Sequence, residues 1–457
     1  MRHSELKRRN ILKVMALASL ASISCKPVVE GRAPIYHFFE NLDELEANKS
    51  KLHVADSVRV GARNLDFKVV LRTTLHNESG SVPGFNYIEL SETQLALKLE
   101  QLPSQFEPNH FGHSEGKTNS IALLFYCADK FNKPIYIPTG EYLVNIPLGP
   151  FHRALTIKGD GPTKSILRTD NNFDGWLLEF IDTGFVASGW KKENNSIKFD
   201  DEVSGVTIQN VGFVSNSKNI EAGCLKFCDR NDNVIIQNVY IHHFSLGAFV
   251  CGICKVRKTA YLRESVISNL TIRQCGNRKN ASMTIQSDGV GDASNQIDFY
   301  SLKIIWPNGP GLVIQNFNDN IPIRRLYFYS LMLHGKEERK DYGADLLAIK
   351  GDVTNVSFAN ARANANEIDS AAISLDELNS KSPRGIDIHL DITTGYGDGV
   401  RVFAGQNIRI WLHSIFVEQT GLIVGDNLVG PLYVHANLNQ LTTNINQTTD
   451  KIHLLNF

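Results

Sequence analysis

Five acidic residues between positions 285 and 345 are the best candidates for chemistry in this sequence. A pair of carboxyl groups held about 5–9.5 Å apart can cleave a glycosidic bond, because one protonates the leaving oxygen while the other acts as nucleophile or activates water. Each acid also has a purely structural interpretation, since Asp and Asn are ordinary turn residues. The candidate catalytic residues are Asp288, Asp292, Asp319, Glu338 and Asp341.

Asp288 and Asp319 form the preferred pair. Gln286 and Gln315 each come directly after a short apolar segment; Asp288 lies two residues after the first glutamine and Asp319 lies four residues after the second. If the two segments are neighbouring strands about 4.8 Å apart, both carboxyl groups leave on the same side and meet. Their repulsion would raise the pKa of one of them, which suits a general acid. Asp292 lies near this pair, and Glu338 and Asp341, on a longer loop, are the alternative pair.

Aromatic, amide and guanidinium side chains near the same acids predict a sugar-binding surface. Aromatic rings have large apolar faces that suit stacking on sugar rings, and amide and guanidinium groups form hydrogen bonds with hydroxyl groups. In the alternative interpretation, Trp306-Pro307 only covers the end of a structural repeat. The candidate substrate-binding residues are Trp306, His334, Tyr342, Arg278 and Gln315.

Local motifs do not support other kinds of site. The sequence has no nucleophile elbow, phosphate loop, His-Glu-x-x-His or calcium-binding nonapeptide. A net charge of −1 and a pI near 6.9 indicate no attraction to nucleic acid. Cys224-x3-Cys228 followed by Cys251-x2-Cys254 has the form of a four-thiolate zinc site, but we favour buried core cysteines, because Cys251 lies in an apolar run. No metal and no cofactor is predicted.

A repeated segment from residue 206 onward indicates how these residues are positioned. The sequence VTIQNVGF at 206–213 is echoed by VIIQNVYI at 234–241 and by later copies. A period of about 30 residues is typical of a solenoid. The polar anchor residues of the copies, separated by 28, 31, 32, 29 and 30 residues, are Asn210, Asn238, Asn269, Ser301, Ser330 and Asn360.

The pattern within each copy predicts the kind of solenoid. Apolar residues lie 4 and 2 positions before the anchor and 1 and 3 positions after it, and another apolar strand precedes each anchor by 15–22 residues. A strand that bends at the anchor turns both halves toward one interior, and short polar side chains bond the bent backbone. The prediction is an all-β fold, a right-handed parallel β-helix, with stacked asparagines at equivalent bends. Because its interior is filled, any chemistry must lie on the outer face or in the loops.

Residues 111–168 predict a helix that covers one end of this stack. Ile121, Leu124, Phe125 and Ala128 recur at three- and four-residue steps, and IYIPTGEY at 135–142 then begins a period of two. Followed by LTIKGDGP at 155–162, this pattern resembles the opening of the pectate-lyase-superfamily right-handed parallel β-helix, in the version seen in phage tailspikes and related polysaccharide-degrading enzymes. The family usually has aspartates before the helix, where this chain has FGHSEGKTNS.

The resemblance implies a polysaccharide substrate and an activity as glycoside hydrolase or polysaccharide lyase, and homotrimeric assembly is a further expectation. The same fold also occurs in inert adhesins, so a non-catalytic surface protein that binds polysaccharide is the alternative. Converging acids beside an aromatic platform would favour the enzyme. Carboxylates scattered around the perimeter would favour the binding protein.

The N-terminal residues 1–25 predict an export signal, because a basic run with RRNILK at 8–13 precedes a modestly apolar stretch; this core resembles the twin-arginine type. Cys25 would be the site of a lipid anchor, and the protein would be periplasmic, membrane-anchored or secreted. A basic amphipathic segment on a cytosolic protein is the alternative. The remaining regions are expected to be a tether at 26–50, a small β module at 51–110, a capping helix with the first coil at 111–150, and the parallel β-helix at 151–457.

Overall fold

The structure is a computed structural model that describes residues 34–71, 85, 87–113, 120–182, 203–216, 221–318, 320–336, 344–364, 369–437, 443–445 and 450–456. Its contacts divide the chain into two compact units, one ending at Glu100 and the other running from Gln101 onward, with residues 62–64 joining the second unit. In the part of the chain that the structure describes, no helix is both long and apolar enough to cross a membrane.

The first unit is built on a five-stranded sheet in the order β1-β2-β3-β5-β4. In β3, every second residue is buried, so one face of the sheet forms the core of this unit. Residues 36–50 fall within the range 26–50 that the sequence assigns to a tether, but they form β1, α2 and most of the short η1, because Phe39 and Leu45 bury their side chains and β1 pairs in parallel with β2. The elements are β1 (Tyr36–Phe39), α2 (Leu42–Ala47), η1 (Lys49–Lys51), β2 (Ser57–Val60), η2 (Gly61–Arg63, at the boundary), β3 (Leu65–Leu71), β4 (Tyr87–Glu89) and β5 (Leu95–Leu99).

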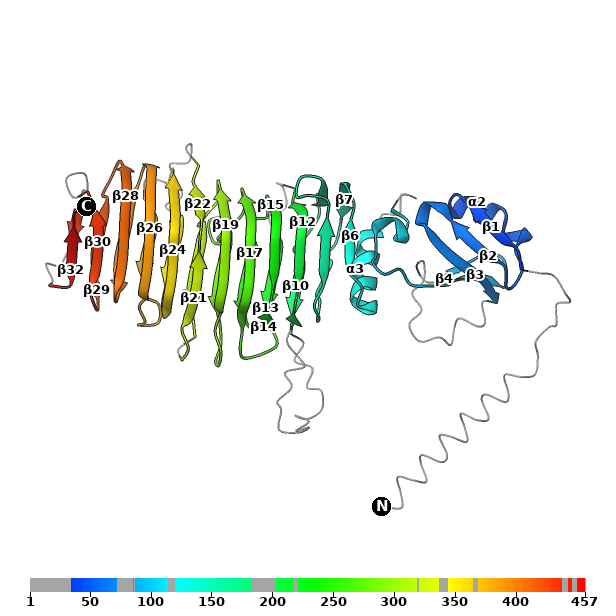
Figure 1. Cartoon of the computed structure of the whole chain (residues 1–457), viewed down its shortest axis with the longest axis horizontal. Coiled ribbons are helices and arrows are strands. Elements are labelled where there is room, and N and C mark those ends of the chain that lie inside the picture. The colour runs from blue at the N-terminus through cyan, green and yellow to red at the C-terminus, as the bar shows by residue number, and fades with distance from the viewer. Residues whose placement is uncertain are drawn as a thin grey trace, which may run out of the picture. The chain divides into compact units, whose positions relative to one another are not determined.

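The second unit begins with an amphipathic helix, α3 (Ser120–Phe131), as the sequence predicts. Its apolar stripe is buried, and Phe125 packs against Phe151 with ring centroids 6.0 Å apart. Figure 1 shows α3 at the end of the stack where β6 and β7 lie. The helix therefore covers apolar side chains that the first coil would otherwise expose to water. The short elements around it are η4 (Pro108–Phe111), β6 (Ile135–Ile137), β7 (Gly140–Val144), β8 (Thr156–Gly159) and β9 (Ser165–Thr169).

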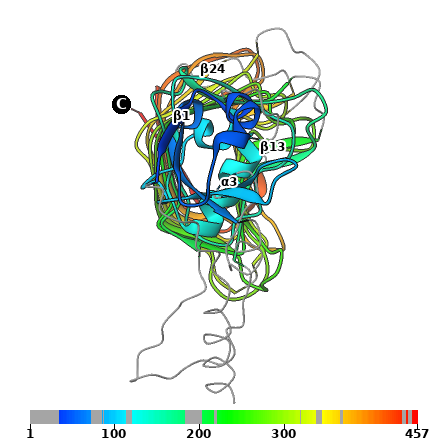
Figure 2. The same cartoon turned by 90° about the vertical axis from the view of Figure 1, so that its right-hand side faces the viewer.

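The rest of the unit is a stack of coils in which every strand pairs in parallel with its equivalent in the next coil (Figure 1). Figure 2, which looks along the stack, shows the coils superposed around one outline. One face is a ten-stranded sheet, whose strands are β10 (Gly175–Ile181), β13 (Ala222–Cys228), β16 (Gly247–Ile253), β18 (Met283–Ser287), β20 (Leu312–Asn316), β23 (Leu347–Lys350), β25 (Ala371–Asp376), β27 (Asp398–Gly405), β29 (Leu422–Leu428) and β31 (Thr443–Ile445).

The other wall is a seventeen-stranded sheet that bends within each coil and also includes β6 to β9. The architecture is the predicted right-handed parallel β-helix, in agreement with the handedness of nearly all parallel crossovers. The remaining strands of this sheet are β11 (Val203–Ser204), β12 (Thr207–Val214), β14 (Arg230–Asp232), β15 (Ile235–His242), β17 (Tyr261–Arg273), β19 (Asn295–Ile305), β21 (Ile323–Phe328), β22 (Leu331–His334), β24 (Val353–Asn364), β26 (Arg384–Gly395), β28 (Ile408–Val417), β30 (Leu432–Ala436) and β32 (Ile452–Leu455).

The bends fall at the predicted anchor residues. Asn210, Asn238, Asn269 and Ser301 are aligned by the strand register and have left-handed φ values of 57°, 54°, 50° and 61°. The side-chain nitrogen of Asn238 donates to the side-chain oxygen of Asn210 at 2.8 Å, so the predicted asparagine stacking begins there. Short polar side chains tolerate the left-handed region better than other residues, which explains their use at this position.

Two later anchors, Ser330 and Asn360, occupy the same register but are built differently. Ser330 lies between β21 and β22, which are separate strands, and neither residue has a left-handed φ. Beyond this point the register between β24 and β26 shifts between Phe358 and Ala361. The regular bend therefore gives way to a strand break and a bulge, which keep the flanking apolar residues inward.

Stacked aromatic residues fill the interior. Phe180 lies between Phe151 and Phe227, with ring centroids 5.4 and 5.1 Å away, and Phe328 lies between Phe299 and Phe358 at 4.3 and 4.6 Å. Cys251 also points inward, as predicted, and burial raises the pKa of its thiol to about 12. Functional side chains must therefore project from the outside of the coils.

Candidate functional site

The outer face of the ten-stranded sheet carries two rows of polar side chains. Because side chains alternate along a strand, residues aligned by register on the outer face form rows that run across the strands, along the axis of the stack. We call these residues the outer strip. The polar members of the first row are Glu179, Lys226, Thr284, Ser374 and Arg401, and the apolar residues Val250, Val313 and Ala348 lie between them; the second row consists of Gln286, Gln315, Lys350 and Asp376; Asp288 lies just beyond β18.

A chain of hydrogen bonds connects the second row to Asp288. The side-chain nitrogen of Gln315 donates to the side-chain oxygen of Gln286 at 3.1 Å, and the side-chain nitrogen of Gln286 donates to Oδ1 of Asp288 at 2.9 Å. The two glutamines are register partners on β18 and β20, as the sequence predicts. The amides therefore orient the carboxyl group of Asp288 on the outside of the coil.

The pKa of Asp288 is raised above the ordinary value for an aspartate. Burial is the largest cause, because it disfavours the charged form, and the hydrogen bonds from Gln286 and from the backbone of Cys254 only partly oppose it. A carboxyl group that keeps its proton at higher pH is suited to act as a general acid. The strip thus contains a partly buried acid that is held by neutral amides rather than by a cation.

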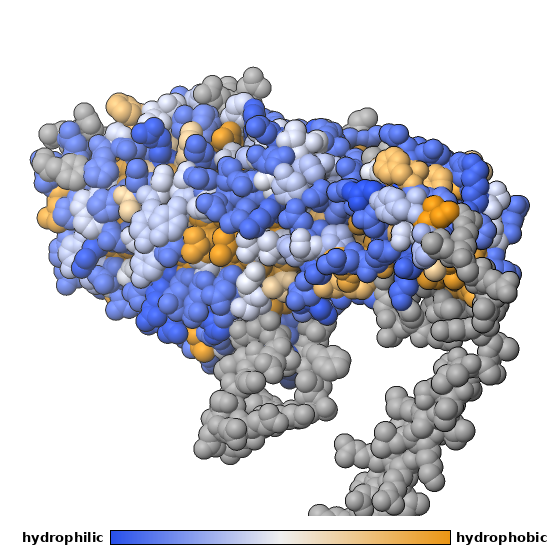
Figure 3. Space-filling model, turned by 45° about the vertical axis from the view of Figure 1, so that its right-hand side comes forward, coloured by the Kyte–Doolittle hydropathy of each residue, from blue (hydrophilic) through white to orange (hydrophobic). Residues whose placement is uncertain are grey.

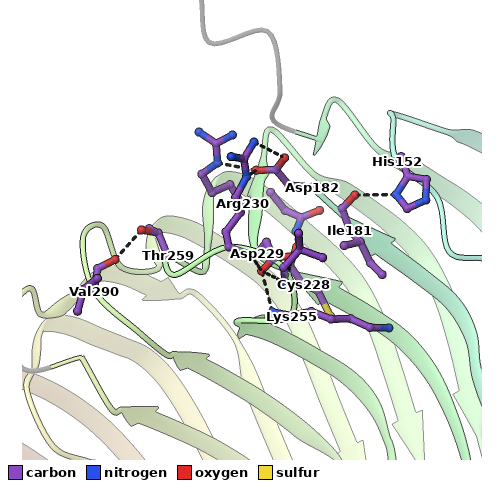
Figure 4. A network of polar contacts seen from close by, with 12 residues as sticks. His152, Ile181, Asp182, Cys228, Asp229, Arg230, Lys255, Thr259 and Val290 are labelled. Carbon is purple, nitrogen blue, oxygen red and sulfur yellow. Dashed lines mark hydrogen bonds and ion pairs between the residues drawn. The ribbon is translucent and has the colours of Figure 1, made fainter. Parts of the chain in front are cut away.

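The loops around Asp288 are fastened to one another. The backbone N–H of Asp288 donates to the carbonyl of Gly252 at 3.0 Å. Val290 forms two hydrogen bonds with the preceding loop. Its N–H donates to the carbonyl of Lys258 at 2.7 Å, and its carbonyl accepts from the Thr259 hydroxyl at 2.5 Å (Figure 4). These bonds restrict the loop that carries Asp288.

Asp229 anchors the same loop system from the preceding coil. This aspartate is buried, and its carboxylate accepts hydrogen bonds from the backbone N–H groups of residues 255–257 at 2.7–3.1 Å, as Figure 4 shows for Lys255. All of its hydrogen-bonding capacity is directed at the backbone. We therefore assign Asp229 a structural role.

Farther toward the N-terminal end of the strip, Glu179 forms ion pairs with Lys226 at 3.2 Å and with Lys255 at 2.8 Å. Burial alone would raise its pKa, but the two lysines outweigh burial and lower it. The pKa of Glu179 is therefore lowered, whereas the pKa of Asp288 is raised. The two carboxyl groups differ because one faces two cations and the other faces an amide.

Next to this group, Asp182 is completely buried and contacts two arginines. Its Oδ2 lies 2.5 Å from Nε of Arg230 and 3.4 Å from Nε of Arg257. Figure 4 shows the side chains converging on Asp182. The two guanidinium groups therefore compensate the negative charge of this buried carboxylate.

Two of the predicted acids, Asp288 and Asp292, have different side-chain partners. Asp292 forms an ion pair with Arg263 at 3.3 Å, and Arg263 also pairs with Asp232 at 2.9 Å, so Asp292 belongs to a cluster beside β14 and β17. Asp288 instead accepts a hydrogen bond from Gln286. Three predicted acids, Asp319, Glu338 and Asp341, and the predicted binding residue Tyr342 lie outside the described residues, so the acid–base pairing stays a prediction.

The predicted binding residues fall into separate places. Gln315 belongs to the outer strip. Trp306 follows β19 and His334 is the last residue of β22, both in the seventeen-stranded sheet, and their ring centroids lie 6.3 Å apart. The connection between β19 and β20 places Trp306 near the start of the ten-stranded sheet's strands, and Gln315 lies near their end. Arg278 is exposed on the turn between β17 and β18.

Sequence reasoning missed Glu179, Lys226 and Lys255. For two of them a signal existed, because Glu179 interrupts the apolar segment GWLLEFI and Lys226 interrupts AGCLKFC. A single charge at an alternating position marks the outer face of a buried strand. Lys255 lies on a loop, and nothing in its local sequence indicates its partner.

A scan against protein-family models found no match to this chain, and neither did a search of curated proteins. Among solved structures, it is similar to the protein ORF18 of Geobacillus virus E2, with 11% identity and a TM-score of 0.52 over 91% of this chain and 75% of that one. This likeness shows the fold alone.

The chain is also similar to two further solved structures, with lower TM-scores of 0.46 and 0.43. The first is the enzymatically active domain of tailspike protein 2 of bacteriophage CBA120, with 12% identity over 96% of this chain and 64% of that one. The second is the A-module of the mannuronan C-5 epimerase AlgE6 of Azotobacter vinelandii, with 12% identity over 74% and 95%. The fold and the outer strip define the class: a right-handed parallel β-helix protein with a polar strip along one sheet.

Proposed function

We propose that the chain is a carbohydrate-active enzyme, a glycoside hydrolase or polysaccharide lyase, that cleaves a polysaccharide bound along the outer strip. The observation that carries this proposal is the raised pKa of Asp288 at the end of the amide chain from Gln315 through Gln286. Two neutral amides position the acid without stabilising its ionised form as strongly as a lysine would. Such a group is suited to protonate a leaving oxygen.

A linear polymer fits the geometry of the strip. The rows run along the stack, across successive strands about 4.8 Å apart, and the second row, from Gln286 to Asp376, has a polar side chain on each of its four strands. The face drawn in Figure 3 is mostly hydrophilic, with scattered apolar residues. A polar polymer can therefore exchange hydrogen bonds with water for hydrogen bonds with successive coils.

In hydrolysis, the carboxyl proton of Asp288 passes to the glycosidic oxygen as the bond from that oxygen to the anomeric carbon breaks, and water completes the sugar product. In the preferred pairing, Asp319 is the second carboxylate, acting as nucleophile or base. In a lyase, a base instead removes a carbon-bound proton. Lys350, the register partner of Gln315, is the candidate for that role.

The test compares Asp288→Asn with the wild-type protein on a panel of polysaccharides. New reducing ends report hydrolysis, and the ultraviolet absorbance of unsaturated products reports elimination. We expect Asp288→Asn to lose about 100-fold or more in turnover with its circular dichroism unchanged. The matched control is Asp298→Asn, on the outer face of β19 in the other sheet, which should keep full activity. Full activity in Asp288→Asn would refute the assignment.

We also propose that the protein is exported by the twin-arginine route, with Cys25 as a lipid-attachment site. The basic run around Arg8-Arg9 and the apolar stretch behind it support this proposal. An exported protein would meet polysaccharides outside the cytoplasm. Homotrimeric assembly stays a prediction.

A further inference from the structure

A second surface is formed where four strands of the seventeen-stranded sheet end. The strand register aligns His242, Arg273, Ile305 and His334. In the first three coils the next residue has a left-handed φ: 65° at His243, 51° at Gln274 and 52° at Trp306. Left-handed non-glycine residues are costly and persist where the surrounding structure requires them. We call His242, His243, Arg273, Gln274, Trp306 and His334 the Trp306 surface.

Planar groups from successive coils contact one another on this surface. The guanidinium carbon of Arg273 lies 4.2 Å from the ring centroid of Trp306, and His334 approaches the same ring edge-on. His242 and His243 stack with ring centroids 3.7 Å apart. Nε2 of His242 lies 2.7 Å from the side-chain oxygen of Gln274. The contacts hold these flat side chains in one orientation before any ligand binds.

Cationic side chains lie near both histidines. Burial is the main cause that lowers the pKa of His242, and Arg273 and Arg168 lower it further; burial also lowers the pKa of His243, with added effects of His242, Arg273 and Lys336. Like charges disfavour a protonated ring, so these cations act in the same direction as burial, and the hydrogen bond with Gln274 opposes them.

Arg273 itself is not neutralised by a carboxylate. Within the described residues no ion pair joins it to an acid, and its buried Nε has no hydrogen-bond partner. Of the neighbouring cations, Arg168 is paired with Glu141. A guanidinium stacked on an indole, with unused donors, matches a ligand that combines a carboxylate with a flat apolar face.

We propose that the Trp306 surface binds an acidic saccharide unit, a hexuronate, with the sugar ring against Trp306 and its carboxylate on Arg273. Gln274 and the two histidines supply further hydrogen bonds to hydroxyl groups. The surface lies near the start of the ten-stranded sheet's strands, and Asp288 lies beyond their end. The proposal therefore concerns a second binding site and does not depend on cleavage at the outer strip.

The test measures binding by isothermal titration calorimetry with the full chain carrying Asp288→Asn, so that the ligand is not consumed by the proposed acid. The probes are tetragalacturonate and neutral maltotetraose. In this background we expect Arg273→Gln to weaken tetragalacturonate binding about tenfold or more, because one charge-assisted contact is lost, and Arg273→Lys to weaken it less. Maltotetraose should bind the parent protein at least tenfold more weakly than tetragalacturonate does.

Two further variants separate this surface from the outer strip and from a general effect of charge. Arg409→Gln removes an exposed arginine on β28 and should leave tetragalacturonate affinity unchanged. Gln315→Ala removes an amide from the strip, and its effect on tetragalacturonate affinity should be smaller than that of Arg273→Gln. Loss of affinity in Gln315→Ala but not in Arg273→Gln would place the acidic sugar on the strip and overturn the proposal. Equal affinity of a folded Arg273→Gln protein, or no binding by the parent, would also overturn it.

Discussion

Gln315 and Gln286 lie 29 residues apart in the sequence, yet the side-chain nitrogen of the first donates to the side-chain oxygen of the second at 3.1 Å. The second glutamine then donates to Asp288. Each coil thus positions side chains of its neighbour, and the environment of the proposed acid depends on residues from two coils. A substitution at Gln286 should therefore change the proton affinity of Asp288.

Replacing Gln286 by Leu should move the pH dependence of cleavage. The hydrogen bond from Gln286 lowers the pKa of Asp288 against the larger effect of burial, so its loss should raise that pKa further. A general acid is active while protonated, and its activity falls as the pH rises through its pKa. The descending limb of kcat/KM against pH should therefore shift to higher pH in Gln286→Leu. Thr284→Val, at the other row of the same strand, is the control and should leave the limb in place.

Asn238→Ala should destabilise the β-helix by about 2 kcal/mol. About half of the loss comes from the hydrogen bond to Asn210, and about half from placing alanine at a left-handed φ of 54°. Asn238→Gly also loses the hydrogen bond but accommodates this φ, so it should cost about 1 kcal/mol. Urea unfolding followed by circular dichroism measures both. An equal loss in the two variants would show that the backbone conformation does not contribute.

Asp182→Asn should destabilise the protein by about 3 kcal/mol or more, because it leaves the guanidinium groups of Arg230 and Arg257 without their buried counter-charge. The control is Glu141→Gln, which breaks an exposed pair with Arg168 and should cost less than about 1 kcal/mol. Thermal unfolding compares the two variants with the wild-type protein. A small effect of Asp182→Asn would show that water or other groups compensate the arginines.

Replacing both Arg8 and Arg9 by Lys should leave the protein in the cytoplasm, because the twin-arginine route requires the arginine pair itself and not only its positive charge. Fractionation and immunoblotting of cells that produce the wild-type or the variant protein measure the outcome. Lys7→Arg is the control and should not alter export. Unchanged export of the double variant would refute the twin-arginine assignment.

The fold follows largely from local patterns. Alternating apolar residues around Asn210 and Asn238 require a strand whose two halves face one interior, and only stacked coils can satisfy every copy at a period near 30 residues. The stripe of Ile121, Leu124 and Phe125 likewise predicts a helix with one buried face, which is observed as α3. These features depend on residues close together in the chain, so periodicity determines them.

The start of the first unit shows where local patterns were insufficient. Residues 36–39 have no clear signal for a strand, yet they pair in parallel with Ser57–Val60 as β1. The strand exists because its partner offers backbone hydrogen bonds, and Phe39 finds a core to bury. Both conditions come from residues farther along the chain, which a local pattern does not contain.

For the candidate sites, the sequence alone determined that Gln286 and Gln315 occupy matching positions and that polar side chains must face outward. Only the tertiary structure decided which of these side chains meet: it joined Asp288 to Gln286, paired Asp292 with Arg263, and stacked Arg273 on Trp306. The physical reason is that alternation along a strand determines on which face a side chain lies. Which side chains come together at the edge of a coil is determined by the conformation of the loops between strands. Those loops are held by contacts between coils, such as that of Asp229 with the backbone of Lys255, which no single repeat contains.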